Sequence, residues 1–575
     1  MLRRIFSYMK EYKKYAWLAL ICIGVEVVLE IMVPKLMADL IDIGVTNSDV
    51  PYIINKGIQM AVCAVAALIL GVGSARFSAL AGQGLGANIR KAEYEKLQSY
   101  SFSNIDHFSV SSLVTRLTSD VTNIQNAVST GMRPFGRSPV MLIFATTLAF
   151  QINSTLALVF LVALPVLAVL LIIIIINVGP RYGRMQGAVD LVNRCIQENL
   201  TAVRVVKSYV RGDYEIEKFG HVNDNLKNES EKAFGIAVLN MPAMQFVMYS
   251  TILGILLIGG RLINSGQMMI GQLTSFLSYV LLILNSLMMM SNVFLLMTRS
   301  LASAERIMKV IDEPIDITDE NAKDIEVKKG EIEFNHVWFK YKDTAKEYVL
   351  SDVSFHINAG QTVGIIGQTG SSKTTLIQLI PRLYDASKGE IKIDGINVKE
   401  YPVRHIRDAI SVVLQKNTLF SGSLIDNLRW GDENATLDEI KEACSIACVD
   451  EFIDRLPGGL DAEMGQEGVN VSGGQKQRIC IARAILKKPK VLILDDSTSA
   501  VDTATEGKIR NALAKKLPDM TKIIIAQRIS SVCHADQIII MDGGRVDAIG
   551  THESLLKTNK IYQEIYESQK EGADL

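Results

Sequence analysis

The chain has 575 residues and a formal net charge of -1, and 49% of its residues are hydrophobic. A charge near zero argues against nucleic-acid binding as the main function. The positive mean hydropathy of +0.22 over this length instead indicates membrane spans in a chain of several domains. Its seven cysteines are scattered without a Cys-x-x-Cys pair, so neither a disulfide framework nor a zinc site is expected.

Residues 1–312 are dominated by apolar runs. About 20 apolar residues form a helix that crosses the hydrocarbon core of a bilayer. Six stretches qualify, at about 15–38, 57–81, 135–152, 155–178, 239–262 and 272–298. The third and fourth are separated only by residues 151–154, which predicts a tight hairpin. The first follows a basic N-terminus and lacks a small-residue cleavage site, so it is interpreted as an uncleaved span.

Basic residues are concentrated at the N-terminus, between spans two and three, and between spans four and five; Arg3, Arg90 and Arg181 are examples. Lysine and arginine are enriched in cytoplasmic loops, so these segments are predicted to be cytoplasmic. An even number of spans then returns the C-terminal half to the cytoplasm. Both long segments are helical in pattern and are expected to extend beyond the bilayer. Patches at 102–108 and 207–214 interrupt these helical segments. Each patch is either a docking element or a solvated turn.

Two carboxylates lie inside the first span. Glu26 and Glu30 are four residues apart and so share one helix face, and Arg76 in the second span is a candidate partner. They form either a cation-attracting or proton-linked surface in a translocation path, or an interhelical ion pair. The last two spans are rich in methionine, which suits either an adaptable ligand surface or ordinary packing. These methionines are Met244, Met248, Met288, Met289, Met290 and Met297.

The remainder has the composition of a soluble α/β domain. A linker at 313–329 is expected to precede a nucleotide-binding domain at 330–575. Strands are predicted at 330–335, 362–366, 410–414, 491–494, 523–525 and 537–541. Helical patterns between them indicate a mostly parallel sheet covered by helices. The predicted fold is therefore an α-helical six-span transmembrane domain followed by an α/β P-loop domain.

A glycine-rich loop lies between the strand at 362–366 and a helical pattern. Backbone N–H groups of such a loop bind phosphates. Lys373 is expected to reach the β- and γ-phosphates, and Thr374 to bind Mg²⁺. Ser372 stands where the strict pattern has glycine, and a left-handed backbone there would cost roughly 1–2 kcal/mol. The predicted nucleotide-binding residues of the loop are Gly367, Gln368, Thr369, Gly370, Ser371, Ser372, Lys373, Thr374 and Thr375.

The apolar run at 491–494 delivers Asp495, the carboxylate expected to bind Mg²⁺ at the nucleotide. The next residue should orient the attacking water and would normally be glutamate. Here it is Asp496, which is one methylene shorter. Because a misplacement of about 1 Å can cost about a hundredfold in rate, the group nearest the chemistry is altered.

A second phosphate-binding helix start precedes that strand. Ser472 can cap the helix, and Gly473 and Gly474, followed by Gln475, let backbone N–H groups approach an anion. This helix cannot face the nucleotide of the first loop without a partner domain.

The motif Ser472, Gly473, Gly474 and Gln475 resembles the signature of the ATP-binding cassette (ABC) family, and the resemblance covers essentially the whole chain. It implies further roles for residues that match family motifs. Tyr341 would stack on adenine, Gln415 would sense Mg²⁺ and the transmembrane contacts, and Asp502 would end the D-loop at 499–502. The loop at 463–468 resembles the exporter loop that touches the transmembrane helices.

Three residues depart from the family pattern. Asp496 replaces the catalytic glutamate, Gln527 replaces the switch histidine, and Ser372 replaces a loop glycine. Cassettes of this family pair head to tail, so that each ATP lies between one phosphate loop and the other signature. An altered loop site beside an intact signature resembles the degenerate-site subunit of heterodimeric bacterial multidrug exporters.

The resemblance implies ATP-driven export of small amphipathic or drug-like molecules across a bacterial inner membrane, with the cassette in the cytoplasm. ATP and Mg²⁺ are the expected cofactors, with Thr374, Gln415 and Asp495 at the metal and Asp496, Gln527 and Gln415 at the reaction. The expected partner is a second half-transporter with an intact glutamate. The alternatives are an active homodimeric lipid or peptide exporter, and an ATP-gated membrane protein that is not a pump. Six spans exclude a soluble ABC ATPase, and the loop at 463–468 disfavours an importer.

Overall fold

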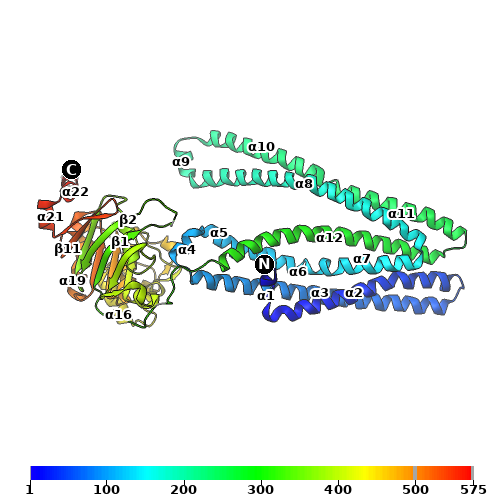
Figure 1. Ribbon diagram of the computed structural model, residues 1–575, viewed down its shortest axis with the longest axis horizontal. Coiled ribbons are helices and arrows are strands. Elements are labelled where there is room, and N and C mark those ends of the chain that lie inside the picture. The colour runs from blue at the N-terminus through cyan, green and yellow to red at the C-terminus, as the bar shows by residue number, and fades with distance from the viewer. Residues whose placement is uncertain (1, 321, 343, 497–500, 572–575) are drawn as a thin grey trace. The chain divides into compact units, whose positions relative to one another are not determined.

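The computed structural model describes residues 2–320, 322–342, 344–496 and 501–571 (Figure 1). The chain forms two compact units. The first comprises Met1–Gln98 and Ser111–Asp312, and the second comprises Ser99–Val110 and Glu313–Leu575. A short segment from the N-terminal half therefore belongs to the second unit.

The first unit is entirely helical in its described residues. Its α-helices are α1 (Leu2–Ser7), α2 (Lys13–Asp39), α3 (Val50–Gln98), α5 (Val110–Thr115), α6 (Val121–Ser129), α7 (Met132–Ile152), α8 (Ser154–Thr201), α9 (Val203–Ser208), α10 (Gly212–Ala237), α11 (Asn240–Asn264) and α12 (Ile270–Ile311). A 3-10 turn, Lys10–Tyr12, and π-helical segments, Leu40–Val45 and Arg116–Asp120, join some of them.

Six helical segments of the described residues are long and apolar enough to cross a membrane, as the sequence predicts. The expected hairpin is also present, because α7 ends at Ile152 and α8 begins at Ser154. The side chain of Asn153 caps α8 by accepting the N–H of Leu156 at 3.0 Å. With 49 residues at about 1.5 Å each, α3 is far longer than a hydrocarbon core of about 30 Å and extends beyond it.

Within this unit α2, α3, α7 and α12 pack side by side, and α8, α10 and α11 form a second group (Figure 1). Buried Ile23, Met141 and Tyr279 belong to an apolar core shared by the spans. The hydroxyl of Tyr279 donates to the carbonyl of Ile31 at 2.9 Å, which ties α12 to α2.

The intramembrane carboxylates pair differently from the sequence prediction. Arg133 Nη2 lies 2.6 Å from Glu26 Oε1, and Arg137 Nη2 lies 2.7 Å from Glu30 Oε2. The partners therefore come from the start of α7, and Arg76 as the partner was wrong. Both pairs have a spacing of four residues, so one face of α2 matches one face of α7. Only the packing of the helices reveals that match.

The second unit contains three sheets. Their strands are β1 (Ile332–Phe339), β2 (Leu350–Ile357), β3 (Thr362–Gly367), β4 (Lys388–Ile393), β5 (Ile396–Asn397), β6 (Ile410–Val413), β7 (Gly422–Ser423), β8 (Glu463–Met464), β9 (Val491–Asp495), β10 (Thr521–Ile525), β11 (Gln537–Asp542) and β12 (Arg545–Gly550). The largest has the order β12-β11-β3-β10-β9-β6 and is parallel except for β12, which confirms the predicted sheet for five of its six expected strands. The strand predicted at 330–335 is instead β1 of a separate antiparallel sheet. An antiparallel sheet, β2-β1-β4-β5, was not expected.

Helices cover the sheets of the second unit. They are α4 (Phe102–His107), α13 (Lys373–Leu379), α14 (Val403–Ala409), α15 (Leu424–Arg429), α16 (Leu437–Ile446), α17 (Asp450–Ile453), α18 (Gly473–Leu486), α19 (Thr503–Lys516), α20 (Ile529–Val532), α21 (His552–Thr558) and α22 (Lys560–Glu571). Cys444 and Cys448 are buried in the apolar core beside α18, as expected for packing residues. Burial raises the pKa of the Cys444 thiol to about 12.

Candidate nucleotide site

Three parallel strands bring the predicted chemistry to one edge of the large sheet. Ile525 of β10 is in register with Asp495 of β9 and with Ile365 of β3. The carboxyl ends of β3, β9 and β10 therefore lie together. This is the edge at which open α/β sheets bind ligands, and here it carries the glycine-rich loop, the two aspartates and Gln527.

The glycine-rich loop follows β3 directly. Gly367 approaches β11 so closely that a Cβ there would lie 2.2 Å from the carbonyl oxygen of Met541. Gly370 has a φ of 86° and Ser372 a φ of 69°, so Ser372 has the left-handed backbone that glycine adopts without strain. The condition raised by the sequence, a left-handed backbone at Ser372, is therefore met.

Lys373 folds over this loop. Its Nζ donates to the carbonyl oxygens of Gly367 and Gln368 at 2.9 Å and to the hydroxyl of Ser371 at 3.2 Å. Burial lowers the pKa of the Lys373 ammonium. The ammonium thus occupies a cradle of loop oxygens, from which an anion with more negative charge could draw it.

Thr374 and Asp495 form a pair of oxygen ligands. The hydroxyl of Thr374 donates to both carboxylate oxygens of Asp495, at 3.1 and 3.0 Å. Asp495 is buried, and burial raises the pKa of its carboxyl group. Hydroxyl and carboxylate oxygens are the ligands that Mg²⁺ prefers, so this pair fits a magnesium ion beside the loop.

Asp496 is held by two amides. Its Oδ2 accepts Gln527 Nε2 at 2.9 Å and Gln415 Nε2 at 3.4 Å. Its backbone is left-handed, with a φ of 46°, and its N–H donates to the carbonyl of Ile525 at 3.0 Å. Burial raises the pKa of the Asp496 carboxyl group. The three residues predicted to lie at the reaction are therefore brought together.

Tyr341 lies beside the helix that follows the loop. Its hydroxyl is 2.9 Å from the hydroxyl of Thr375, and 43% of the residue is exposed. Its ring packs edge-on against Phe339 and Tyr384, with centroids 4.9 and 5.2 Å away. An exposed aromatic face next to the loop is what stacking on a base requires.

Tyr384 is a residue that the sequence reading missed. Its hydroxyl donates to Asp106 of α4 at 2.7 Å, and its ring lies 6.0 Å from that of Phe102. Asn104 of the same helix donates to the carbonyl of Pro314 at 2.8 Å. Of the two readings open for 102–108, docking is therefore correct. Tyr384 joins this docked helix to Tyr341, and only its position after the loop helix could have indicated it.

The signature begins a separate helix. Ser472 Oγ accepts the N–H of Gln475 at 3.3 Å, and Gln475 Oε1 accepts the N–H of Ser472 at 2.9 Å, so the predicted cap of α18 is confirmed. In the described parts of the chain, no hydrogen bond or ion pair joins 472–475 to the glycine-rich loop. Asp502 caps α19 by accepting the N–H of Thr505 at 2.9 Å. Ser499 and Ala500 of the predicted D-loop lie outside the described residues.

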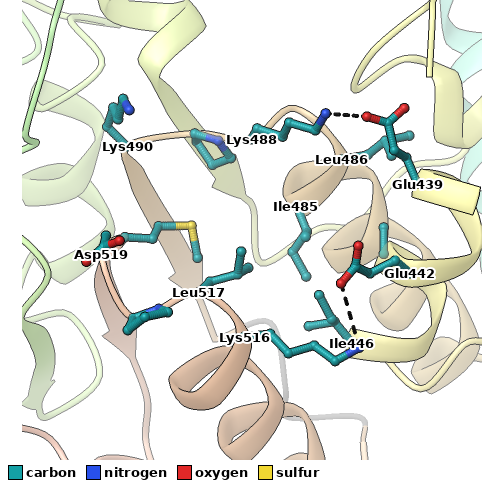
Figure 2. Close-up of a pocket in the computed structure, with 14 residues that line it drawn as sticks. Glu439, Glu442, Ile446, Ile485, Leu486, Lys488, Lys490, Lys516, Leu517 and Asp519 are labelled. Carbon is teal, nitrogen blue, oxygen red and sulfur yellow. Dashed lines mark hydrogen bonds and ion pairs between the residues drawn. The ribbon is translucent and has the colours of Figure 1, made fainter. Parts of the chain in front are cut away.

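A cavity of about 410 Å³ on the same unit is a separate feature (Figure 2). It lies between α16, the end of α18 and the end of α19. Figure 2 shows Lys488 paired with Glu439, and Lys516 paired with Glu442 at 3.9 Å. The contact with Lys488 is the main reason why the pKa of Glu439 falls to about 2. None of the predicted nucleotide-binding residues lines this cavity.

Comparison with known proteins adds two family matches and many relatives. Residues 16–287 match the model of the ABC transporter transmembrane region, and residues 350–499 match that of the ABC transporter. The uncharacterized ABC transporter ATP-binding protein YfiB of Bacillus subtilis is 37% identical over 575 residues, all of both chains. The chain belongs to the ABC transporter family. It is a multi-pass protein of the bacterial inner membrane with a cytoplasmic cassette that binds ATP.

Two more relatives are named for export or lipid flipping, and one solved structure shares the fold. An ATP-dependent lipid A-core flippase of Pseudomonas putida is 32% identical and is aligned over 98% of this chain and 95% of its own. A putative multidrug export ATP-binding/permease protein of Bacillus subtilis, YgaD, is 31% identical over 84% of this chain and 83% of its own. A bacterial Atm1-family ABC exporter with ATP bound has the same fold, with a TM-score of 0.83 and 21% identity over 97% of this chain and 98% of that one. The transporter is therefore an ATP-driven exporter of a family that acts as dimers.

Proposed function

We propose that this chain is one half of a heterodimeric exporter of small amphipathic or drug-like molecules. Its own phosphate-loop site hydrolyses ATP slowly, and its intact signature completes the active site of the partner. The partner is a different half-transporter that carries the catalytic glutamate. The putative multidrug exporter among the relatives supports the substrate class. Residues 1–312 would form the transmembrane domain, 313–329 the linker and 330–575 the cassette; the division into compact units at Asp312 supports this boundary.

The observation that carries the proposal is the state of Asp496. A general base needs an oxygen free to take a proton from water. Oδ2 of the shorter Asp496 side chain accepts the amide of Gln527 at 2.9 Å and that of Gln415 at 3.4 Å, so two amides compete with water for that oxygen. Gln527 has no titratable group and cannot become a cation beside the γ-phosphate, as a histidine can. Both changes weaken the same step.

The other residues would still bind the nucleotide. Loop N–H groups between Gly367 and Thr375 and the Lys373 ammonium would bind the phosphates, and Tyr341 would stack on adenine. Thr374, Asp495 and Gln415 would hold Mg²⁺, which neutralises phosphate charge when it is bound. Gly473, Gly474 and Gln475, behind the Ser472 cap, would face the partner's ATP, and Asp502 would order the helix that follows the D-loop.

The test compares steady-state ATPase rates of the purified chain alone and of the chain co-purified with its partner half. We expect the pair to exceed the homodimer by at least tenfold at saturating ATP and Mg²⁺. Equal rates per site would overturn the proposal.

One observation favours a second candidate, an active homodimeric lipid exporter. The lipid A-core flippase of Pseudomonas putida aligns with nearly the whole chain at 32% identity. That candidate predicts full turnover by the homodimer and stimulation by lipid, so the same measurement separates the two.

A further inference from the structure

A cavity of about 820 Å³ lies inside the transmembrane unit. Helices α2, α3 and α12 supply most of its wall, and α7 contributes Arg133. The wall combines apolar side chains, such as Leu68, Val72 and Leu281, with the carboxylates of Glu26 and Glu30. Leu68 and Val72 are 66% and 63% exposed, which leaves a wide apolar surface beside the charged groups.

Glu26 is the most deeply placed charge in this wall. The residue is only 2% exposed, yet its two carboxylate oxygens differ. Oε1 accepts Arg133 Nη2 at 2.6 Å. Oε2 is buried and has no hydrogen-bond partner among the described residues. A buried acceptor without a donor is costly, and more so when it is charged. The site therefore lacks one hydrogen-bond donor.

The charged groups at the cavity form one cluster of two carboxylates and two guanidiniums. Arg137 lies 2.7 Å from Glu30 Oε2 and 3.7 Å from Glu26 Oε1, but it does not line the cavity. The charged groups that line the cavity are the two carboxylates and the guanidinium of Arg133. Gly71 keeps this corner clear, because a Cβ there would lie 3.2 Å from Glu26 Oε1 and 3.3 Å from Arg133 Nη2. An alanine would press directly on the ion pair.

An ion pair that only joined α2 to α7 would need neither the cavity nor the unpaired oxygen. Ionisable groups within membrane spans usually face the interior of the protein or a water-filled cavity and serve function. The missing donor, the carboxylates in the wall and the apolar surface beside them specify the chemistry of a ligand.

We propose that this cavity binds an amphipathic organic cation whose N–H group donates to Glu26 Oε2. Its apolar body lies along Leu68, Val72 and Leu281. Glu30, paired with Arg137, is a second carboxylate in the wall, and Arg133 holds Glu26 Oε1 and leaves Oε2 without a donor. The inference rests on the proposed export function and names its substrate class.

The first experiment measures binding to the wild-type full-length chain in lipid nanodiscs without nucleotide. Three probes share one fluorophore and one alkyl chain, and they end in a primary ammonium, a trimethylammonium or a sulfonate. Fluorescence anisotropy gives their dissociation constants, with empty nanodiscs as the blank. We expect the ammonium to bind at least tenfold more tightly than the sulfonate, with the trimethylammonium between them because it has charge but no donor. A sulfonate that binds as tightly as the ammonium would overturn the proposal.

The second experiment tests the residues with the ammonium probe. Glu26→Gln keeps the shape of the side chain and should weaken binding about tenfold or more, since hydrogen bonds to charged groups are the stronger ones. Arg133→Gln removes the competing cation and should leave binding equal or tighter. Glu95→Gln is the matched control, because Glu95 is an exposed acid of α3 paired with Lys91 at 3.9 Å.

Each variant is compared with wild type by its size-exclusion profile and thermal unfolding. If Glu26→Gln does not fold, Glu26→Asp takes its place, because it keeps the charge but withdraws the oxygen and should also weaken binding. Unchanged binding by a folded Glu26 variant would refute the site. Loss of binding in a folded Arg133→Gln variant would assign the cavity to an anionic or zwitterionic ligand instead.

This measurement is independent of the nucleotide chemistry. Binding without nucleotide requires neither hydrolysis nor the partner half. A normal ATPase pair that shows no cation preference would refute the cavity proposal alone. A clear cation preference in a chain whose homodimer hydrolyses ATP at full rate would refute the heterodimer alone.

Discussion

At the scale of single residues, the altered site differs from the family pattern by a few atoms. Asp496 has a left-handed backbone, and its Oδ2 accepts hydrogen bonds from the amides of Gln527 and Gln415, at 2.9 and 3.4 Å. These amides hold the carboxylate in place through Oδ2. Under the proposed function, its charge does little chemistry, although it lies next to Asp495.

Asp496→Asn should leave the ATPase rate of the pair within about threefold of wild type. Removal of the partner's glutamate should instead lower it steeply, because a positioned general base contributes roughly 10²–10⁴-fold. Steady-state phosphate release from matched preparations measures both. The degenerate-site account is wrong if the two variants lose activity to a similar extent.

The complementary change is Asp496→Glu together with Gln527→His. It restores the missing methylene and a titratable ring, so hydrolysis at this site should rise. In the homodimer, where each site has the same parts, the increase should be at least tenfold. The single variant Gln527→His serves as the control and should change the rate little, because the short carboxylate remains.

Ser372 makes a prediction about stability rather than catalysis. The left-handed backbone of Ser372, with a φ of 69°, destabilises the folded chain by about 1–2 kcal/mol. Glycine at this position should remove part of that cost. Ser372→Gly should slow hydrogen exchange of the α13 amides about fivefold, while Ser372→Val should speed it. Mass-spectrometric exchange in detergent measures this. Equal exchange in the glycine and valine variants would contradict the argument from strain.

At the scale of elements, α4 is held to the cassette by a few contacts that can be tested one at a time. The Tyr384 hydroxyl donates to Asp106 at 2.7 Å, a charge-assisted bond of the kind worth about 1.5–3 kcal/mol. Tyr384→Phe keeps the ring beside Phe102 but removes the donor. Amides of 101–107 should then exchange at least tenfold faster, while unstimulated ATPase activity of the pair changes little.

A second contact of α4, which the Tyr384→Phe variant keeps, sets how far the helix should loosen in the exchange experiment. The Asn104 side chain still donates to the carbonyl of Pro314 in the Tyr384→Phe variant, so α4 should loosen without being lost. Asp106→Asn, which removes the charge from the same bond, should have a similar effect. Unchanged protection in both variants would show that the apolar contact alone holds α4.

The helix start at Gly473 is the second element with a sharp test. Gly473→Asp places a carboxylate where the partner's γ-phosphate is expected, so the pair should lose most of its turnover. The helix itself should not suffer, because an acid in the first turn suits the helix dipole. Gly473→Asn has the same size without the charge and should lose less. Retained ATPase activity in Gly473→Asp would mean that the active site uses the other signature.

The elements that the sequence predicts correctly are those whose signals lie within one short stretch of residues. Continuous apolar runs predicted the spans and the parallel strands, and the Ser472 cap followed from residues in sequence proximity. The antiparallel sheet was missed because it joins segments that are far apart in the sequence: β1 pairs with β2 on one side and, on the other, with β4, which follows only after the loop helix. Pairings such as Glu26 with Arg133, or Tyr384 with Asp106, depend on the docking of distant segments. No local pattern encodes those contacts.

At the scale of the whole molecule, an exporter of this family works as a dimer, so an altered site must be read together with its partner site. The phosphate-loop site here retains the groups that would bind ATP: the loop, Lys373, and the Thr374–Asp495 pair joined at 3.0 Å. Under the proposed function, the groups altered at this site are those that would hydrolyse it. In the pair, this site should therefore hold intact ATP while the other site turns over.

This expectation gives a direct measurement. The pair is mixed with radiolabelled ATP and Mg²⁺ and passed rapidly through a desalting column, and the retained nucleotides are separated by chromatography. About half of the retained label should be ATP, because one of the two sites hydrolyses slowly, and it should persist over many turnovers of the other site. Asp496→Glu with Gln527→His should convert this fraction to ADP, since the base and the titratable ring are then restored. Rapid loss of all ATP from the wild-type pair would show that both sites are catalytic, and the altered residues would then be tolerated substitutions in an active enzyme.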